Sequence, residues 1–162
     1  MKIIVKNNTL LINDFKFKCC VGKNGTSSYK IEGDKKTPKG LYSIGNLYFR
    51  ADRIKNVKTR LKKIRINQKM GWCDDPKEKN YNKLIKINKK LNCEKMYKKS
   101  KNYDLLIPIN YNYPKTIKKK GSAIFIHLTQ NYSKTLGCIA LKKKDMLILL
   151  KLIDKNTKIK IL

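Results

Sequence analysis

The apolar residues of this chain come in short runs, and only one run has both the length and the spacing of a helix. A stretch of about 18 apolar residues, which a transmembrane helix needs, does not occur. Short runs bounded by turn residues are typical of β-strands. We therefore expect a mainly β fold with one helix near the C-terminus and no transmembrane segment.

The strand-like runs dominate the first half and the last third of the chain. We expect strands over residues 2–6, 9–12, 15–21, 37–50, 105–109, 123–128 and 158–162. Asn13 and Asp14 fit a hairpin turn between two of them. The spacing of residues 144–154 predicts a helix, with Asp145 favourably placed in its first turn. Residues 52–101 carry little periodicity, so irregular structure with short strands is expected there.

The length of 162 residues fits a single domain over residues 1–162. A chain of this size buries roughly 70% of the surface that it exposes when unfolded. No linker, repeat or tail indicates a second domain. The first residues contain only three successive apolar side chains, Ile3 to Val5, so no secretory signal is visible.

The net charge of +29 comes from 40 basic and 11 acidic residues. An excess of this size favours an anionic partner. However, the lysines are scattered in twos and threes, and coding bias would produce the same pattern, so both origins stay open. The chain has no RNP-type aromatic run, zinc finger or basic helix, so we expect no nucleic-acid partner.

The only histidine, His127, precedes Cys138 by eleven residues. A thiolate is a strong nucleophile, and an imidazole can lower its pKa, take the proton and deliver it to a leaving group. Backbone N–H groups around Gly137 and Cys138 are the expected oxyanion hole, and a backbone carbonyl is the expected partner of the second ring nitrogen. The alternative is that both residues are ordinary members of a buried core.

The other four cysteines carry weaker signals. Five is an odd number, so at least one thiol stays unpaired, and no disulfide framework is predicted. One histidine cannot complete the usual zinc ligand sets and no Cys-x-x-Cys occurs, so we expect no metal site. Cys19 and Cys20 lie in a strand-like run and are expected to be buried. Cys73 is a rival nucleophile with no histidine near it in the sequence.

Several segments resemble one known family. Ile-His-Leu at residues 126–128, followed by Thr-Leu-Gly-Cys at 135–138, is similar to the catalytic motif of YkuD-type L,D-transpeptidases. Upstream, Thr-Pro-Lys-Gly at 37–40 resembles the Thr-Pro-x-Gly segment of that family. Residues 48–53 and 70–82 resemble a compact branch of it. The resemblance implies a β-sandwich of mixed sheets with one C-terminal helix packed against it, forming a single L,D-transpeptidase-like catalytic domain.

The same resemblance implies roles for the residues of the motif. Cys138 is the nucleophile and His127 the base, and Thr135, Leu136 and Gly137 form the loop that precedes the thiol. The implied reaction is cysteine acyl transfer on peptidoglycan stem peptides, without a cofactor, and it implies a place in the periplasm or cell envelope.

The motif departs from many relatives at two positions. Leu136 stands where they have a second histidine, and Ala140 stands where they have an arginine. Without that arginine a fixed cation is missing near the acyl site, so recognition of the donor peptide must be arranged differently. Arg50, Arg53 and Lys142 are candidates to replace it, and the sequence does not select among them.

Four residues are candidates for binding the substrate: Trp72, Arg50, Asp74 and Tyr81. Trp72 is read as a wall of the substrate cleft, with ordinary partial burial of a large aromatic residue as the alternative. Asp74 is read as a site for an acceptor amine. Its alternative is a surface ion pair with one of the many lysines.

The predicted function is a monomeric peptidoglycan L,D-transpeptidase that forms cross-links between stem peptides through a cysteine thioester. The donor position is either the first or the third residue of the stem. Two alternatives stay open at this point. One is a carboxypeptidase or endopeptidase on the same fold, in which water replaces the acceptor amine. The other is a basic polymer-binding module without chemistry, whose binding would be sensitive to salt.

Overall fold

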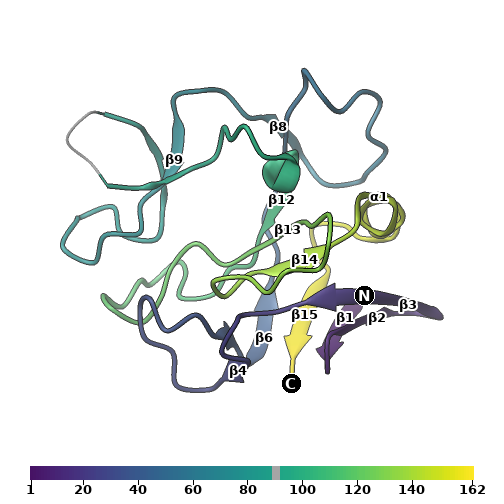
Figure 1. The fold of residues 1–162 in the computed structure, drawn as a ribbon, viewed down its shortest axis with the longest axis horizontal. Coiled ribbons are helices and arrows are strands. Elements are labelled where there is room, and N and C mark those ends of the chain that lie inside the picture. The colour runs from purple at the N-terminus through teal and green to yellow at the C-terminus, as the bar shows by residue number, and fades with distance from the viewer. Residues whose placement is uncertain (89–91) are drawn as a thin grey trace.

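A computed structural model describes residues 1–88 and 92–162 of the chain. Within these residues it contains one ten-stranded sheet, two small sheets and one α-helix (Figure 1). The strands are β1 (Lys2–Lys6), β2 (Thr9–Ile12), β3 (Phe15–Cys20), β4 (Thr26–Ser27), β5 (Thr37–Pro38), β6 (Gly40–Ser43), β7 (Leu47–Phe49), β8 (Lys63–Arg65), β9 (Met70–Trp72), β10 (Leu84–Lys86), β11 (Glu94–Lys95), β12 (Leu105–Pro108), β13 (Phe125–Leu128), β14 (Ile139–Leu141) and β15 (Lys158–Ile161). A short 3-10 helix, η1 (Lys101–Tyr103), precedes β12, and the helix α1 (Lys143–Leu152) follows β14.

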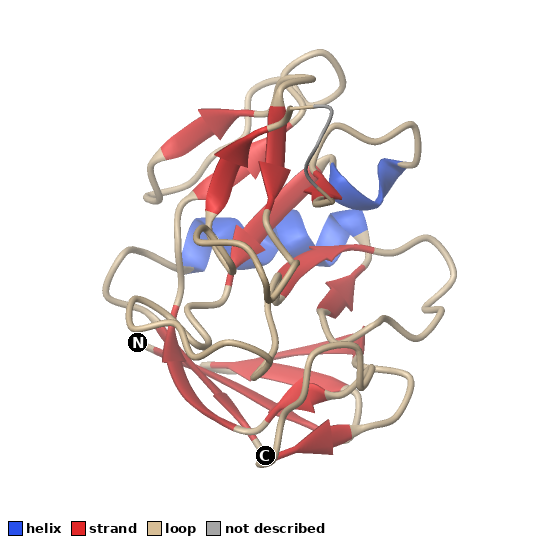
Figure 2. Ribbon diagram, turned by 90° about the vertical axis from the view of Figure 1, so that its left-hand side faces the viewer, coloured by secondary structure: helices blue, strands red, loops and turns tan. Residues whose placement is uncertain are grey.

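The large sheet has the strand order β6-β15-β1-β2-β3-β14-β13-β12-β7-β8. It is mixed, because β1 and β15, β13 and β14, and β7 and β8 run parallel while the other neighbours run antiparallel. The sheet curls into a half-barrel. Figure 2 shows α1 between the strands of the lower part and those of the upper part. The mainly β class, the mixed sheet and the single helix packed against it are confirmed.

The main core lies inside the curl of this sheet. The buried side chains of α1, which are Met146, Leu149 and Leu150, join the same apolar cluster as residues of β1, β2, β12, β13 and β15. A second, smaller cluster lies on the other face of β12 and β13, and it contains Phe125 and Cys138. Since successive side chains of a strand point to opposite faces, β13 contributes to both clusters.

The first two strand connections are tight hairpins. Ile12 pairs with Phe15, which leaves Asn13 and Asp14 as the turn, as predicted. Asn13 has φ 48°, in the left-handed region that asparagine tolerates better than most residues. These turns fix the register of β1, β2 and β3 and bring Cys19 and Cys20 beside β14.

Two expectations need correction. Residues 37–50 form three short strands, β5, β6 and β7, because the chain passes from β15, the neighbour of β6, to β12, the neighbour of β7. The strand β14 was not predicted, since three residues are too few to show an alternation. Residues 52–101 hold short strands and irregular structure, as expected, although residues 89–91 of that stretch lie outside the described residues.

Candidate active site

The strand β13 places His127 on the face of the small cluster. The residue is buried, with 8% of its surface exposed, and its Nδ1 lies 2.8 Å from the Leu128 carbonyl oxygen. A carbonyl can only accept, so Nδ1 carries the proton and Nε2 is left with its lone pair. Burial lowers the pKa of the imidazole to about 4. The imidazole of His127 is therefore neutral at pH 7.

The parallel pairing of β13 and β14 brings Cys138 to the same face. His127 pairs with Ala140, and Ile126 pairs with Ile139. Side chains two residues apart on a strand share a face, so Cys138, two residues before Ala140, lies on the same face of the sheet as His127. The thiol donates to the Ala123 carbonyl at 3.3 Å and accepts from the Phe125 N–H at 3.3 Å. Burial raises its pKa to about 12.

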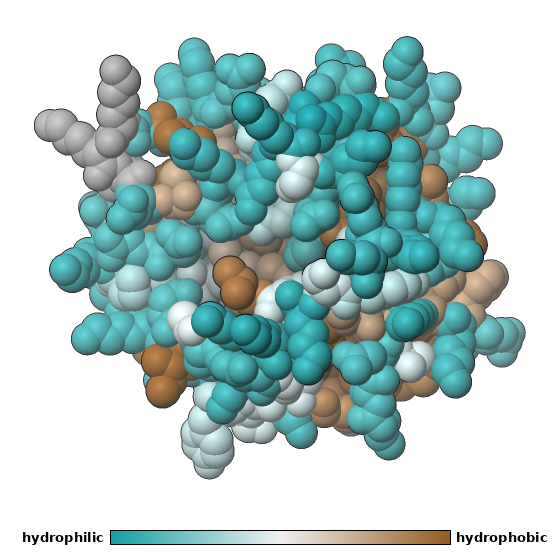
Figure 3. Space-filling view, viewed as in Figure 1, coloured by the Kyte–Doolittle hydropathy of each residue, from teal (hydrophilic) through white to brown (hydrophobic). Residues whose placement is uncertain are grey.

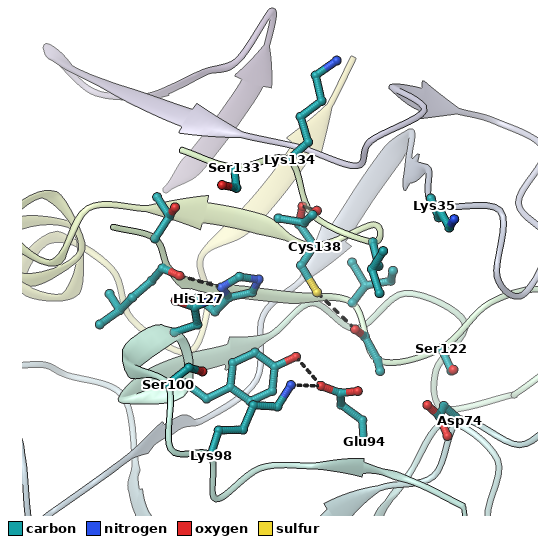
Figure 4. Close-up of a pocket in the computed structure, with 18 of the residues that line it drawn as sticks. Lys35, Asp74, Glu94, Lys98, Ser100, Ser122, His127, Ser133, Lys134 and Cys138 are labelled. Atoms are coloured by element: carbon teal, nitrogen blue, oxygen red, sulfur yellow. Dashed lines mark hydrogen bonds and ion pairs between the residues drawn. The ribbon is translucent and has the colours of Figure 1, made fainter. Parts of the chain in front are cut away.

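The side chains of His127 and Cys138 line the same cavity, which has a volume of ≈ 750 Å³. Figure 4 shows the Cys138 sulfur on the side of the imidazole that faces away from the Leu128 carbonyl. The predicted carbonyl partner of the ring is thus present. The expectation that the imidazole lowers the pKa of the thiol is not met in this state, because burial dominates and the thiol bonds to Ala123 instead.

The loop before Cys138 is held by Thr135. Its hydroxyl donates to the Cys138 carbonyl at 2.6 Å and accepts from the Gly137 N–H at 3.1 Å. Its backbone bonds to Val21 and Lys23, so the loop is tied to the chain that follows β3. One of the two predicted oxyanion donors, the N–H of Gly137, is therefore engaged by Thr135, while the Leu136 side chain is 75% exposed at the cavity rim.

Gly137 is required where the two motifs meet. Its φ is 135°, and a Cβ at this position would lie 2.9 Å from the Lys36 carbonyl oxygen. Thr37, which follows Lys36 in the chain, is fully buried and accepts a hydrogen bond from the Gly22 N–H at 2.8 Å. The start of the Thr-Pro-Lys-Gly segment therefore packs against the loop that precedes Cys138.

We expect Gly137→Ala to lower the free energy of unfolding by about 3 kcal/mol. Alanine is strained at this φ, and its methyl group would also lie too close to the Lys36 carbonyl oxygen. Gly25→Ala is the matched control, since Gly25 has φ 80° and a methyl group added there would meet none of the described residues within 4 Å, its two chain neighbours apart. The control should lose only about 1 kcal/mol. Urea denaturation of both variants measures the difference, and equal losses would argue against the close approach.

Charged residues of both signs line the cavity. Three of the 11 acids are here, Glu32, Asp74 and Glu94, together with Lys30, Lys35, Lys98 and Lys134. Glu94 accepts the Tyr103 hydroxyl at 2.9 Å and forms an ion pair with Lys98. The Tyr103 ring lies beside the imidazole, with ring centroids 5.3 Å apart. The wall opposite the catalytic loop is thus an ordered polar cluster.

The structure distributes the four predicted substrate residues differently. Asp74 lines the cavity, and burial raises the pKa of its carboxyl group. Trp72 lines another cavity, and its ring packs edge-on against Phe125 with ring centroids 5.2 Å apart. Tyr81 is buried and donates to Glu32, which also accepts from Ser122.

Arg50 does not line the cavity. Its guanidinium is 3% exposed and makes a bidentate ion pair with Asp52, at 2.8 and 2.6 Å. The rival thiol of Cys73 is buried and also lies outside the cavity, and burial raises its pKa. All five cysteines are free thiols, and Cys19 and Cys20 are buried as predicted.

Glu94, Lys98 and Tyr103 were missed by the sequence analysis. Glu94 and Lys98 lie in the stretch without periodicity and Tyr103 follows it, and the fold brings η1, which contains Tyr103, against β13. The sequence offered one signal, the scarcity of acids, and three of the 11 acidic residues line the cavity that contains Cys138.

The buried imidazole makes stability depend on pH. In the unfolded chain the pKa of His127 is about 6.5, and folding lowers it to about 4. Between these values the unfolded state binds a proton that the folded state does not. The free energy of unfolding therefore falls as the pH drops from 6.5 to 4, by up to about 3 kcal/mol. Urea denaturation at pH 7 and pH 5 gives the difference in the free energy of unfolding between the two pH values. This difference should be smaller in His127→Gln than in the parent. An equal difference in both proteins would contradict the effect of burial on the pKa of His127.

The comparison with known families decides what the chain is related to. Residues 1–161 match YkuD, the L,D-transpeptidase catalytic domain. The chain belongs to the YkuD family. This family acts on peptidoglycan stem peptides. No curated protein matches the chain.

Two solved structures share this YkuD fold. The first is the helical cell shape determining protein Pgp2 from Campylobacter jejuni, with 18% identity and a TM-score of 0.52. The second is its K307A mutant, with 19% identity and a TM-score of 0.50. Each match covers 99% of this chain and 46% of the other, so the chain spans about half the length of these structures. Among the described residues, no helix is long and apolar enough to cross a membrane.

Proposed function

We propose that this YkuD domain is a cysteine acyltransferase that forms cross-links between peptidoglycan stem peptides, with Cys138 as nucleophile and His127 as base. The observation that carries the proposal is the parallel pair β13 and β14. It aims the only imidazole and a thiol of the family motif into one cavity. The donor bond follows the first or the third residue of the stem.

The first half of the reaction is acylation. In the free enzyme the thiol and the imidazole are both neutral, so the proton passes from Sγ to Nε2 of His127 as the sulfur attacks the peptide carbonyl. Backbone N–H groups beside the thiol stabilise the oxyanion; the Phe125 N–H, which donates to Sγ at 3.3 Å in the free enzyme, is a candidate donor. His127 then protonates the departing amine, which leaves a thioester on Cys138.

The second half is transfer. The amine of a neighbouring stem attacks the thioester and loses a proton to His127. The tetrahedral intermediate then expels the Cys138 thiolate, which takes the proton back from the imidazole, and the new amide is released. Water in place of the amine would give a carboxypeptidase or endopeptidase with the same residues.

The surface charge suits this substrate and its location. The protein carries a net charge of +29, and hydrophilic side chains cover most of the face drawn in Figure 3. Stem peptides bear several carboxylates, so this field raises their local concentration at low salt. We propose a monomer that acts in the periplasm or cell envelope on an anionic polymer other than nucleic acid.

Incubation with purified peptidoglycan, followed by mass analysis of the muropeptides, tests the proposal. New dimers that depend on the active protein are the expected result. Trimmed monomers without dimers would make the protein a hydrolase. An unchanged profile combined with salt-sensitive binding that survives Cys138→Ala would make it a binding module.

A further inference from the structure

The catalytic cavity has a fixed cation that the family motif does not supply. Ala140 stands where many relatives carry an arginine, and none of the candidate replacements, Arg50, Arg53 and Lys142, lines the cavity. Four lysines do. Lys30 is 5% exposed and paired with Asp34, and Figure 4 shows the Lys134 side chain pointing away from Cys138 and Lys35 lying apart from both Cys138 and His127.

Lys98 is held beside the catalytic pair. Its ammonium group pairs with Glu94 and lies 4.1 Å from the centroid of the Tyr103 ring, which in turn lies beside His127. The hydroxyl of Tyr103 donates to the same Glu94 oxygen. The Lys98 side chain is 34% exposed and its ammonium group has three N–H donors, so it can donate to a ligand in the cavity as well as to Glu94.

The two arginines grip the backbone that carries this lysine. Arg50 donates to the Lys98 carbonyl at 2.7 Å, and its ring-stacked guanidinium lies 3.6 Å from the Tyr97 ring centroid. Arg53 donates to the carbonyls of Lys99 and Ser100 at 3.1 and 3.3 Å. Both guanidinium groups are also neutralised by aspartates. They are therefore occupied with protein groups and fix the segment that leads from Lys98 to Tyr103.

We propose that Lys98 recognises the donor: it binds a carboxylate of the peptide next to the bond that Cys138 attacks. It takes the place of the cation missing at Ala140, and Arg50 and Arg53 are positioning residues that act through it. Glu94 and Tyr103 hold the ammonium in place before the ligand arrives, which limits the conformational entropy lost on binding. This inference rests on the proposed function, because the carboxylate belongs to a stem peptide.

Peptide binding tests the specificity. A stem tetrapeptide is prepared with free carboxylates and with carboxamides, and its affinity for Cys138→Ala is measured by calorimetry. The free acid should bind about tenfold more tightly. Adding Lys98→Met should abolish this preference, and adding Lys98→Arg should keep it. Lys99→Met is the matched control, since it removes the same charge from an exposed neighbour outside the cavity. A preference that survives Lys98→Met would overturn the proposal.

Alkylation of Cys138 tests the cation without any peptide. The anionic reagent iodoacetate and the neutral reagent iodoacetamide are allowed to react with the otherwise unmodified protein, and the rate at Cys138 is followed by peptide mass mapping. Lys98→Met should lower the iodoacetate-to-iodoacetamide rate ratio about tenfold, while Lys98→Arg and Lys99→Met leave it near that of the parent. An equal ratio in Lys98→Met and Lys99→Met would overturn the role of Lys98. Since this result does not depend on peptidoglycan, a failure of the proposed function would show separately, in the muropeptide profile.

Discussion

Replacing Cys138 by alanine lowers the rate of acyl transfer by about 10⁴-fold or more, because Cys138 is the one thiol among the described residues that line the cavity. The rate is measured as the initial appearance of cross-linked product from stem peptides, quantified by mass spectrometry. Cys138 is buried at 8% exposure, so the folded state of the variant is checked by its thermal unfolding transition.

Cys73→Ala is the matched control for this loss. It makes the same chemical change at another buried thiol, which lies outside the cavity. This variant should keep most of the parent rate. If Cys73→Ala were inactive and Cys138→Ala active, the nucleophile would have been assigned to the wrong cysteine.

His127→Gln is expected to lower kcat by about 10²- to 10⁴-fold, since the variant lacks the imidazole that takes the proton of the thiol. The parent should also show an acid limb. Its kcat/KM falls as the pH drops through about 4, where the imidazole becomes protonated, and stays level toward neutral pH. The glutamine variant should lack this limb.

The pH dependence also separates two states of the free enzyme. A thiol with a pKa of about 12 beside a neutral imidazole predicts slow alkylation of Cys138 at pH 7 that accelerates into the alkaline range. A preformed thiolate–imidazolium pair would instead give fast alkylation with a plateau near neutral pH. Observation of that plateau would contradict the neutral pair.

The fold could be predicted where the signal is local. The hairpin at Asn13 and Asp14 and the strands that it joins follow from residues close together in the sequence, and so does the helix α1. The strand β14 could not be predicted, because its three residues are strand-like only through pairing with β13 on one side and β3 on the other. The break of residues 37–50 into three strands likewise depends on which distant strand each piece finds.

The site divides in the same way. His127 and Cys138 stand in one motif, so their convergence was predictable from the sequence, whereas the close approach of Gly137 to the Lys36 carbonyl was not. The state of the pair was not predictable, because it depends on burial by residues from other strands. The sequence predicted that Arg50 binds substrate, but its guanidinium forms an ion pair with Asp52 and donates a hydrogen bond to the Lys98 carbonyl. The fold instead places Lys98, 48 residues further along the chain, among the lysines that line the cavity.

The acyl-enzyme itself is the most direct test of the central claim that Cys138 is the nucleophile. The protein is incubated with a donor stem peptide, quenched in acid and digested, and the cysteine-containing peptides are mapped by mass spectrometry. The account predicts a thioester-linked stem fragment on the peptide that contains Cys138, present in the parent and in Cys73→Ala and absent in Cys138→Ala. An adduct on any other cysteine, or turnover that continues in Cys138→Ala, would contradict it.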